Sequence, residues 1–474
     1  MLRSLLLSFA IVTLCFANAA TFTVTSSADG TTTDGVSLRW AITQANSSNG
    51  VDTIAFNIPG MPPHVIGINT LLPNVGTGNV YINGLSQPAN SYTGPEPKIV
   101  IQDNAGLAQA LYFFATTASK VDGIWCRDFN SYGIYAFGSS INVTVDMCKL
   151  SNNQTNGVYL VGSNANLIIR NSTVWGNGTD GIDVFGAGAY CTIENNLVSS
   201  NGATGILING GSAPSVIKGN RVGTDSSGTM PAPNVSHGIL VNTNSNLIGG
   251  PLVGEGNTVA YNFGDGIRIS IGDFNLVTRN SLFCNAGLGI NLVTGGNSNF
   301  ASPVITSATT AAAGGTAVAN SRIELYYDTS CVGCEGKNFI ATLNADAAGN
   351  WNYSGPLTLN SLITATAIDT ANDNTSRFSA CMQVMTVGQG EGFTPGNFML
   401  YPNPSIGIVF IKVGEGVGEV EVYNILGEKI IQTSIIASGT HEIKLDLSGN
   451  APGIYFIQLV GSNKRLIGKV LLLD

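Results

Sequence analysis

The sequence predicts an all-β chain: a right-handed parallel β-helix, followed by an immunoglobulin-like β-sandwich and a small C-terminal β-sandwich. Three observations predict it: a glycine with a branched apolar residue after it at a fixed period, short alternating apolar strands without helical periodicity, and a tail of further alternating strands. The period is typical of stacked units rather than one globular core. The glycines concerned are Gly133, Gly157, Gly181 and Gly205, 24 residues apart, and then, at longer or uneven spacing, Gly238, Gly266 and Gly289.

Each period contains three short strands. After Gly181 the segment Ile182-Asp183-Val184 alternates, a second strand follows at Thr192-Ile193, and a third apolar step comes at Leu197-Val198. Three strands in one period, without a helix, make one rung of a β-helix, and rungs stack about 4.8 Å apart with like residues above like. We expect this coil to cover residues 111–300.

Asparagines recur near one turn of the predicted rung. Asn171, Asn195 and Asn280 lie 14 residues after their glycines, and Asn220 lies 15 after its own. Stacked asparagine side chains bond to one another along a ladder, so we expect a ladder at these positions.

Residues 1–20 have the features of a secretory signal peptide. Arg3 supplies the positive charge, an apolar run extends from Leu5 to Phe16, and Ala17-Asn18-Ala19 forms a small-x-small cleavage site. The apolar run is too short to span a bilayer, and no other segment is long enough for a membrane helix. The sequence therefore predicts an exported chain without a transmembrane segment.

Residues 21–110 are expected to hold an N-terminal cap and the first coils. Ser37 is placed to cap a helix whose apolar face consists of Leu38, Ala41, Ile42 and Ala45. Such a helix would cover the unpaired strand edges at the end of the coil. The segment 37–41, with 52–56, also resembles the CSLREA-type N-terminal module of exported bacterial β-helix proteins, although Val36 replaces Cys and Trp40 replaces Glu.

Residues 301–387 lose the glycine period and contain seven or so short strands, which an immunoglobulin-like sandwich fits. Residues 388–397 are rich in glycine and are expected to form a linker. Seven cysteines lie outside the signal segment. We expect a disulfide from Cys331 or Cys334 to Cys381, with a zinc site at Cys331-x-x-Cys334 as the weaker alternative. For Cys126 and Cys148, 22 residues apart, a disulfide and buried free thiols both remain open.

Residues 398–474 contain alternating strands separated by Gly and Asn turns, enough for a small β-sandwich. The opening Tyr401-Pro402-Asn403-Pro404, the strand at Val422-Tyr423-Asn424 and the segment Pro452-Gly453-Ile454-Tyr455 resemble the type A sorting domain of the type IX secretion system. The resemblance implies a Bacteroidota-type bacterium, recognition by the type IX machinery and export through the outer membrane. The chain would then lie on the cell surface or outside the cell, after cleavage of this domain.

A column of charged residues is predicted on one side of the coil. Asp146, Arg170 and Glu194 are each 24 residues apart, so they should lie above one another with alternating sign. A carboxylate beside an arginine is the arrangement that β-helix polysaccharide lyases use, usually with calcium. Alternating charge is also what a solvated structural ladder needs, and we expect the structural role.

A second outward column starts two residues after each glycine. It contains Tyr135, Tyr159, Asp183 and Arg268, with Phe137 and Phe185 two positions further along their strands. Aromatic side chains at rung spacing are suited to stacking on sugar rings, and Asp183 and Arg268 would add polar selection. The alternative is that another segment covers these aromatic residues.

No complete active site is evident in the sequence. Asp180 and Asp183 are close enough to approach as a hydrolase carboxyl pair, and with Glu194 and Arg170 they are weak catalytic candidates. Three histidines lie in three different segments, so no metal site is predicted, and the net charge of −9 argues against nucleic acid. No cofactor is expected, except calcium if the chain is a lyase.

The expected function is therefore that of a non-catalytic surface or secreted protein, adhesin-like, which binds an extracellular polysaccharide or a host or cell-surface glycan. A polysaccharide lyase or glycoside hydrolase is one alternative, because the fold often hosts such enzymes. A purely structural surface spacer is the other.

Overall fold

The computed structural model describes residues 19–48, 50–76, 78–210, 214–328, 335–386, 399–413, 417–434, 441–461 and 465–473. Nearly all of the predicted signal segment, and the whole predicted linker 388–397, lie outside the described residues. The chain divides into two compact units, residues 1–385 and 386–474, and each is described by itself.

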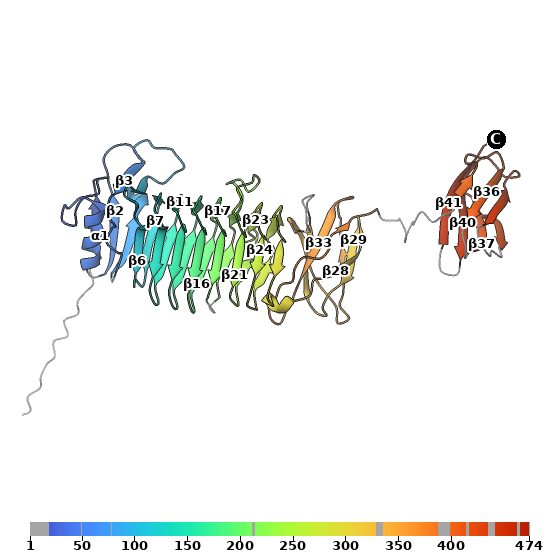
Figure 1. The fold of residues 1–474 in the computed structure, drawn as a ribbon. Coiled ribbons are helices and arrows are strands. Elements are labelled where there is room, and N and C mark those ends of the chain that lie inside the picture. Colours follow the sequence, from blue (N-terminus) through green and yellow to red (C-terminus); the bar gives the residue numbers. More distant parts are fainter. Residues whose placement is uncertain are drawn as a thin grey trace, which may run out of the picture. The chain divides into compact units, whose positions relative to one another are not determined.

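The first unit is built around a right-handed parallel β-helix with three sheets, as predicted (Figure 1). Strands of one sheet pair in parallel and in the predicted register: Ile182 lies between Val158 and Ile206. Sheet A contains β1 (Thr21–Val24), β2 (Val51–Phe56), β4 (Asn79–Asn83), β7 (Ser119–Asp122), β10 (Asn142–Asp146), β13 (Asn166–Arg170), β16 (Tyr190–Glu194), β19 (Val216–Lys218), β22 (Leu247–Gly249) and β25 (Leu276–Thr278).

Sheets B and C complete each rung. Sheet B contains β3 (His64–Ile68), β5 (Ile99–Asp103), β8 (Ile124–Arg127), β11 (Lys149–Ser151), β14 (Thr173–Trp175), β17 (Leu197–Ser199), β20 (Arg221–Val222), β23 (Thr258–Ala260) and β26 (Ser281–Phe283). Sheet C contains β6 (Gln109–Phe114), β9 (Tyr132–Phe137), β12 (Val158–Val161), β15 (Ile182–Phe185), β18 (Ile206–Asn209), β21 (Ile239–Asn242), β24 (Ile267–Ile269) and β27 (Ile290–Leu292). Two short 3₁₀ helices, Gly84–Ser86 and Gly296–Asn299, lie in turns.

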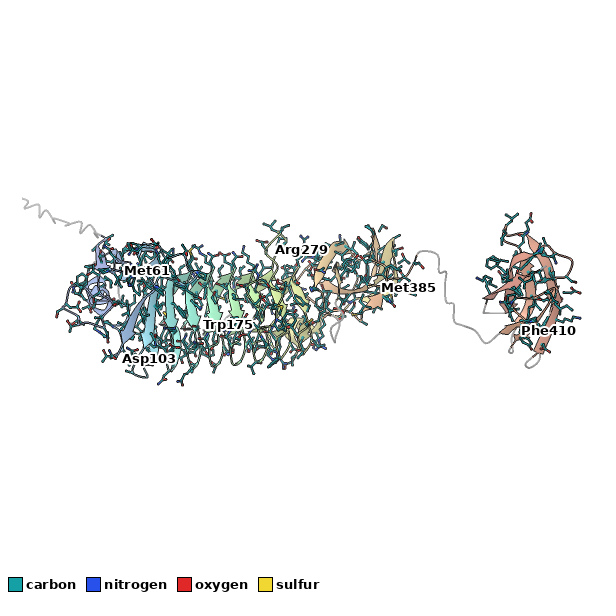
Figure 2. All side chains as sticks on the ribbon, turned by 90° about the horizontal axis from the view of Figure 1, so that it is seen from above. Met61, Asp103, Trp175, Arg279, Met385 and Phe410 are labelled. Atoms are coloured by element: carbon teal, nitrogen blue, oxygen red, sulfur yellow. The ribbon has the colours of Figure 1, made fainter. Side chains whose placement is uncertain are left out.

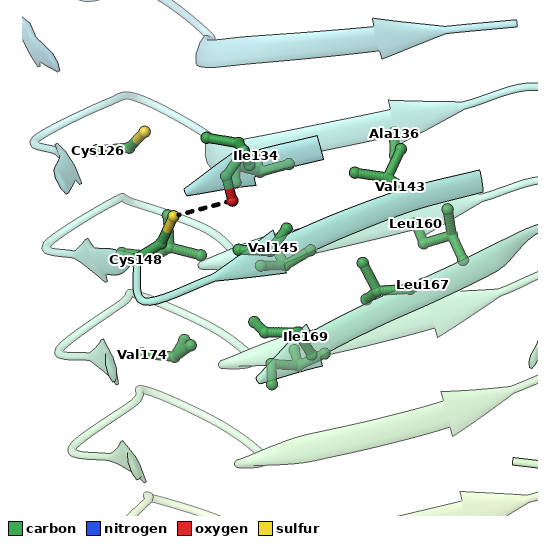
Figure 3. Packing of buried hydrophobic residues seen from close by; sticks show 14 of the residues in the cluster. Cys126, Ile134, Ala136, Val143, Val145, Cys148, Leu160, Leu167, Ile169 and Val174 are labelled. Atoms are coloured by element: carbon green, nitrogen blue, oxygen red, sulfur yellow. Dashed lines mark hydrogen bonds between the residues drawn. The ribbon is translucent and has the colours of Figure 1, made fainter. Parts of the chain in front are cut away.

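The interior of the coil is a continuous stack of apolar side chains. In each strand alternate residues point inward, so Val145, Leu160, Leu167 and Ile169 pack against their neighbours above and below (Figure 3). Burying one such side chain contributes about 1.5–3 kcal/mol relative to leaving it in water. The outward side chains of the same strands line the surface of the coil along its length, and that of Trp175 on β14 is half-buried (Figure 2).

Asparagine ladders hold the turns, and the predicted register is confirmed for Asn220 and Asn280 but wrong for Asn171 and Asn195. In each ladder the backbone N and Nδ2 of one asparagine donate to Oδ1 of the next, as Asn257 does to Asn280, both at 2.9 Å. Asn171 and Asn195 lie one residue before the ladder, with φ of 52° and 58°, so their side chains point elsewhere. The ladder next to them contains Asn196, Asn220, Asn257 and Asn280.

Two further ladders follow the other corners of the coil. The corner between sheets B and C carries Asn153, Asn177, Asn201, Asn234, Asn262 and Asn285. The corner between sheets C and A carries Asn246, Asn275 and Asn297. All of these side chains are buried. Their amide groups satisfy one another's hydrogen-bonding capacity. These bonds stabilise the coil, since a buried polar group without a partner costs about 1–3 kcal/mol.

The N-terminal end of the coil is closed by α1 (Leu38–Ser47), as predicted (Figure 1). Ser37 is the N-cap and its hydroxyl accepts from the backbone N of Trp40 at 3.2 Å. The four predicted apolar residues, from Leu38 to Ala45, are buried in the coil core. The helix therefore covers strand edges that would otherwise be open to association.

Residues 304–385 form two antiparallel sheets around a shared core that includes Ile323, Trp351 and Ile363. We call this part the sandwich. One sheet contains β28 (Val304–Thr309), β29 (Ala312–Thr316) and β32 (Asn350–Ser354). The other contains β30 (Arg322–Tyr327), β31 (Asn338–Asn344), β33 (Leu362–Ile368) and β34 (Met382–Gln383). The described strands number seven, as the sequence predicts.

The second unit is a smaller pair of antiparallel sheets with its own core, which includes Val420, Ile457 and Val470. One sheet contains β35 (Met399–Tyr401), β36 (Ile408–Val413) and β39 (His441–Asp446). The other contains β37 (Val417–Tyr423), β38 (Lys429–Ser434), β40 (Gly453–Gly461) and β41 (Arg465–Leu472).

The structure decides between a Cys126–Cys148 disulfide and two buried free thiols. Cys126, Cys148 and Cys191 are buried free thiols, so Cys126 and Cys148 form no disulfide. On the next rung the register partner of Cys126 is Leu150, and Cys148 lies in the turn between β10 and β11. Cys284 and Cys381 each take part in a disulfide bond. Cys331 and Cys334 lie outside the described residues, so the predicted pairing with Cys381 stays a prediction.

Candidate functional site

The outward face of sheet C carries two neighbouring columns of side chains. The strand column lies two residues after each glycine of the period, and the turn column lies one residue before each glycine. Tyr112, the register partner of Tyr135, extends the strand column by one rung, with Ala110 in the glycine position. Contacts between the two columns, described below, show that they share one surface, which we call the sheet C face. The strand column contains Tyr112, Tyr135, Tyr159, Asp183, Leu207, Leu240, Arg268 and Asn291. The turn column contains Tyr132, Asn156, Asp180, Thr204, His237, Asp265 and Leu288.

The tyrosines of the sheet C face stack on one another. The rings of Tyr112 and Tyr135 are 4.9 Å apart and 13° from parallel, and those of Tyr135 and Tyr159 are 5.8 Å apart and 17° from parallel. Tyr132 of the turn column packs against both Tyr135 and Tyr159, at 5.0 and 5.1 Å. None of these tyrosines is buried under another segment. Their faces are largely used within the ladder, so they offer edges and hydroxyl groups rather than open faces.

Beside the tyrosines runs a row of exposed phenylalanines. Phe114, Phe137 and Phe185 are 42%, 40% and 43% exposed, with Val161 between the last two. The rings of Phe114 and Phe137 stack at 6.1 Å and 12°. Two of the predicted binding residues, Phe137 and Phe185, therefore lie in solvent next to the tyrosine ladder.

The stacked tyrosines, which we call the tyrosine ladder, are followed on the next rung by two aspartates. Asp183 is the register partner of Tyr159 on the next rung, and Asn156 Nδ2 donates to its Oδ2 at 3.3 Å. Within the described residues, its buried Oδ1 has no hydrogen-bond donor. Asp180 Oδ1 accepts from the backbone N of Thr204 at 2.8 Å.

The environment of Asp183 favours its neutral form. Burial, together with the charge of Asp180, raises the pKa of Asp183 to about 7, against the hydrogen bond from Asn156. Burial also raises the pKa of Asp180 above its ordinary value. At neutral pH the Asp183 carboxyl is therefore protonated in part of the molecules, where it can donate a hydrogen bond, and ionised in the rest, where it only accepts.

A second polar cluster lies three rungs away, about 14 Å along the coil. Asp265 is buried, and its Oδ2 accepts from Arg268 Nη1 at 3.2 Å and from Asn291 Nδ2 at 3.0 Å. The backbone N of Asp265 donates to His237 Nδ1 at 2.9 Å, which leaves the ring proton on Nε2. Burial lowers the pKa of His237, so the ring is neutral and Arg268 is the cationic group of this cluster.

The charged column lies on a different sheet. Asp146, Arg170 and Glu194 are register partners on sheet A, as predicted, and Arg170 Nε bonds Asp146 Oδ2 at 2.8 Å. The column continues with Lys218, whose Nζ is 3.9 Å from Glu194 and 3.1 Å from Glu255. Of the four weak catalytic candidates, the structure brings Asp180 and Asp183 together and places Arg170 and Glu194 on another sheet.

Of the turn column, the sequence predicted Asp180 as a site residue but not Tyr132, Asn156 or His237. The signal was present, because each of these residues immediately precedes a glycine of the period. Within the part of the chain that the structure describes, no group of three or more His, Cys, Asp or Glu side chains is arranged to hold a metal ion. In that same part, no helix is both long and apolar enough to cross a membrane.

Two segments match known protein families. Residues 399–472 match the secretion system C-terminal sorting domain, over almost the whole second unit. The chain is exported by type IX secretion. Its destination is the cell surface or the extracellular space. Residues 101–248 match the right-handed β-helix region, in agreement with the coil.

Several solved structures resemble the chain at low identity. The A-module of mannuronan C-5 epimerase AlgE4 from Azotobacter vinelandii is 14% identical, over 55% of this chain and 79% of that one, with a TM-score of 0.32. Pectate lyase Pel9A is 14% identical over 59% and 74%, with a TM-score of 0.31. Tailspike protein 2 of Escherichia coli O157:H7 bacteriophage CAB120 is 12% identical over 91% and 65%, with a TM-score of 0.24. No curated protein matches the chain.

Proposed function

We propose that this exported protein binds an extracellular polysaccharide or cell-surface glycan on the sheet C face, without turning it over. The observation that carries the proposal is the step where the tyrosine ladder meets Asp183. There a ring, an amide and a carboxyl oxygen that lacks a donor lie within two neighbouring rungs. A sugar presents apolar C–H groups and many hydroxyl donors, which suit this combination.

The rest of the sheet C face supports an extended ligand. Exposed Phe137 and Phe185 lie beside the step, and the Arg268 cluster lies further along the same coil face. A polymer that follows the coil axis would contact several rungs at once. Such repeated contacts raise affinity without requiring a deep pocket.

Retention on immobilised polysaccharides tests this proposal. Mature full-length protein is passed over neutral and acidic polysaccharides, and Tyr159→Ala and Asp183→Asn are compared with Glu194→Gln on sheet A. We expect retention that both sheet C variants weaken at least about fivefold, a loss of ~1 kcal/mol, and that the sheet A control keeps. Equal retention of all variants, or none for the unmodified protein, would contradict binding at this face and favour a structural spacer.

Glycoside hydrolysis or elimination is a second candidate function, because the pKa of Asp183 lies near 7 beside a second carboxyl group. A carboxyl pair with one raised pKa is the arrangement required for acid–base work on a glycosidic bond. Reducing ends and unsaturated products are measured on the same panel, with and without calcium. Turnover that Asp183→Asn abolishes and Glu194→Gln keeps would replace the non-catalytic proposal.

A further inference from the structure

The N-terminal end of the coil holds a carboxyl group on its inner side. Asp52 occupies an inward position of β2, followed by inward Ile54 and Phe56, and it is 0% exposed. Its register partner on β4 is Val80, which is also buried. Aspartate side chains are almost never fully buried unless they are paired, so a partner for Asp52 is expected.

Two groups donate hydrogen bonds to this carboxyl group. The backbone N of Ala20 lies 2.8 Å from Oδ1, and the hydroxyl of Ser48 donates to Oδ2. Among the described residues, no Lys, Arg or His side chain forms an ion pair with Asp52. A buried carboxylate that has only neutral donors is costly, because no opposite charge offsets its loss of water.

The surroundings of Asp52 favour a cation for a second reason. Ser48 is the C-cap of α1, and α1 lies beside β2 (Figure 1). The C-terminal end of a helix carries a partial negative charge, which favours a cation and disfavours the Asp52 carboxylate. The last turn of α1 contains no basic residue. A positive group next to Asp52 would therefore balance both the carboxylate and the helix end.

The nitrogen that donates to Asp52 is also the one that signal cleavage would expose. Ala20 directly follows Ala17-Asn18-Ala19, the small-x-small sequence after which a signal peptidase is expected to cut. Hydrolysis there consumes one water, whose oxygen enters the new Ala19 carboxylate and whose two protons go to the Ala20 nitrogen. Because an α-amino group is mostly protonated at neutral pH, this nitrogen stays an ammonium.

The pairing of β1 with β2 holds the Ala20 nitrogen in place. Ala20 O accepts from the backbone N of Thr53 at 2.8 Å, and Thr21 is the register partner of Thr53. Ala20 is half-buried, and Ala19 before it is exposed. An ammonium at this position can therefore direct one proton to Asp52 and the others to water.

We propose that the chain is cleaved between Ala19 and Ala20, and that the new α-ammonium group forms an ion pair with the buried carboxylate of Asp52. Removal of the signal segment thus completes the N-terminal end of the coil, because the uncut chain offers Asp52 only an amide. The pair ties β1, the edge strand of sheet A, to β2 beneath α1. This inference concerns the N-terminal end and is independent of glycan binding at the sheet C face.

The cleavage site is tested on the protein that its own cells export. Peptide mass spectrometry identifies the first residue of the exported chain. We expect the N-terminal peptide to begin with Ala20. A chain that begins at any other residue overturns the proposal.

The ion pair is tested on the full mature chain with three N-termini. These are free Ala20, acetylated Ala20, and a chain that retains Ala19 and so carries its ammonium one residue further out. Each form is made with Asp52 and with Asp52→Asn. Amide hydrogen exchange is read at Thr53, which donates to Ala20 O, with the amide of Tyr190 in the middle of sheet A as the internal reference.

With Asp52 present, we expect the Thr53 amide to exchange at least about fivefold faster in the acetylated and extended forms than with free Ala20. The amide of Tyr190 should stay protected in all three. In Asp52→Asn the three N-termini should give equal exchange at Thr53, within about twofold. Equal exchange of the three forms with Asp52, or the same differences in Asp52→Asn, overturns the ion pair.

A second measurement needs no substitution, and it decides the question if Asp52→Asn also removes the protection of Tyr190. An α-amine reacts with an acylating reagent only in its uncharged form, and a neighbouring carboxylate favours the charged form. At neutral pH, the chain that begins at Ala20 should be acylated at its N-terminus at least about tenfold more slowly than the chain that retains Ala19. The N-terminal peptide is followed by mass spectrometry. Equal rates for the two chains overturn the proposal.

Discussion

Tyr159 and Asp183 are register partners on neighbouring rungs, so the tyrosine ladder of the sheet C face ends directly on a carboxyl group. Two ring contacts, with Tyr132 and Tyr135, hold the tyrosine side of this step, and a single long hydrogen bond from Asn156 reaches the aspartate side. A site that leaves a buried carboxyl oxygen without a donor is destabilising for the fold, and such sites are commonly retained for a ligand or a reaction.

Asp183→Asn should stabilise the protein at high pH and not at low pH. The folded state raises the pKa of Asp183 from 3.8 to about 7, so the folded protein holds this proton more tightly than the unfolded chain. Stability from Asp183 is full below about pH 4 and is lost as pH rises to about 7. We expect a gain on the order of 2 kcal/mol for the variant at pH 8, and none at pH 4, in urea unfolding.

Asp146→Asn provides the control of opposite sign. Hydrogen bonds from Asn171 and Arg170 outweigh burial and hold the pKa of Asp146 below its ordinary value. Its stabilisation is therefore present above about pH 4 and lost as pH falls through the lowered pKa. This variant should lose stability at pH 8 in the same measurement. A gain at pH 8 in both variants, or in neither, would contradict the assigned environments.

Asn201→Ala should destabilise the coil by about 3 kcal/mol. Asn201 is buried, and its Oδ1 accepts both the backbone N and Nδ2 of Asn177 at 3.1 and 3.0 Å. Removing the amide leaves these two donors, and the Asn234 Oδ1 acceptor, short of a partner in a dry site. Chemical unfolding measures the loss. Exposed Asn130→Ala is the control and should change stability by less than about 0.5 kcal/mol.

The asparagine ladder between sheets A and B shows how much of the fold could be predicted from the sequence. The glycine period gave the strands and their register, because inward and outward residues alternate and each rung repeats the last. It did not give the side-chain direction at a turn. Asn195 and Asn196 are adjacent, and only the positive φ of Asn195 decides that Asn196 points inward.

Only part of the candidate site was predicted, because the glycine period describes the strands but not the turns. The strand column followed from alternation, so Tyr135, Tyr159 and Asp183 were placed on one face. The turn column depends on how the chain enters each strand, which the spacing does not describe. Ring stacking likewise depends on the side-chain rotamers of Tyr135 and Tyr159, so the sequence predicted aromatic residues on the surface but not that they pack on each other.

The free thiols of the coil should be unreactive until the protein unfolds. Burial raises the pKa of Cys148 and of Cys191 to about 12, and that of Cys126 well above its ordinary value. The thiolate is the reactive form, and all three sulfur atoms are also shielded from solvent. Maleimide labelling at pH 8, read by peptide mass spectrometry, should leave these cysteines unmodified in the native protein and modify all three in urea. Rapid native labelling of Cys126 or Cys148 would contradict their placement.

Tyr135→Ala should cost more than its exposure suggests, because Tyr135 is the centre of the ladder. Its ring contacts Tyr112, Tyr132 and Tyr159 within 6 Å, so one truncation removes three ring pairs that are each worth about 0.5–1.5 kcal/mol. We expect a loss of about 2 kcal/mol in urea unfolding, together with a reduced near-UV circular dichroism signal.

Two variants separate stacking from other effects. Tyr135→Phe keeps the ring and should retain most of the stability, and Phe185→Ala removes an exposed ring outside the ladder and should change stability by less than about 0.5 kcal/mol. If Tyr135→Ala and Phe185→Ala cost the same, the stacked ladder contributes nothing beyond side-chain area. In that case the tyrosine faces are free to turn toward a sugar, and direct stacking of the ligand on Tyr135 and Tyr159 would become the better account of binding.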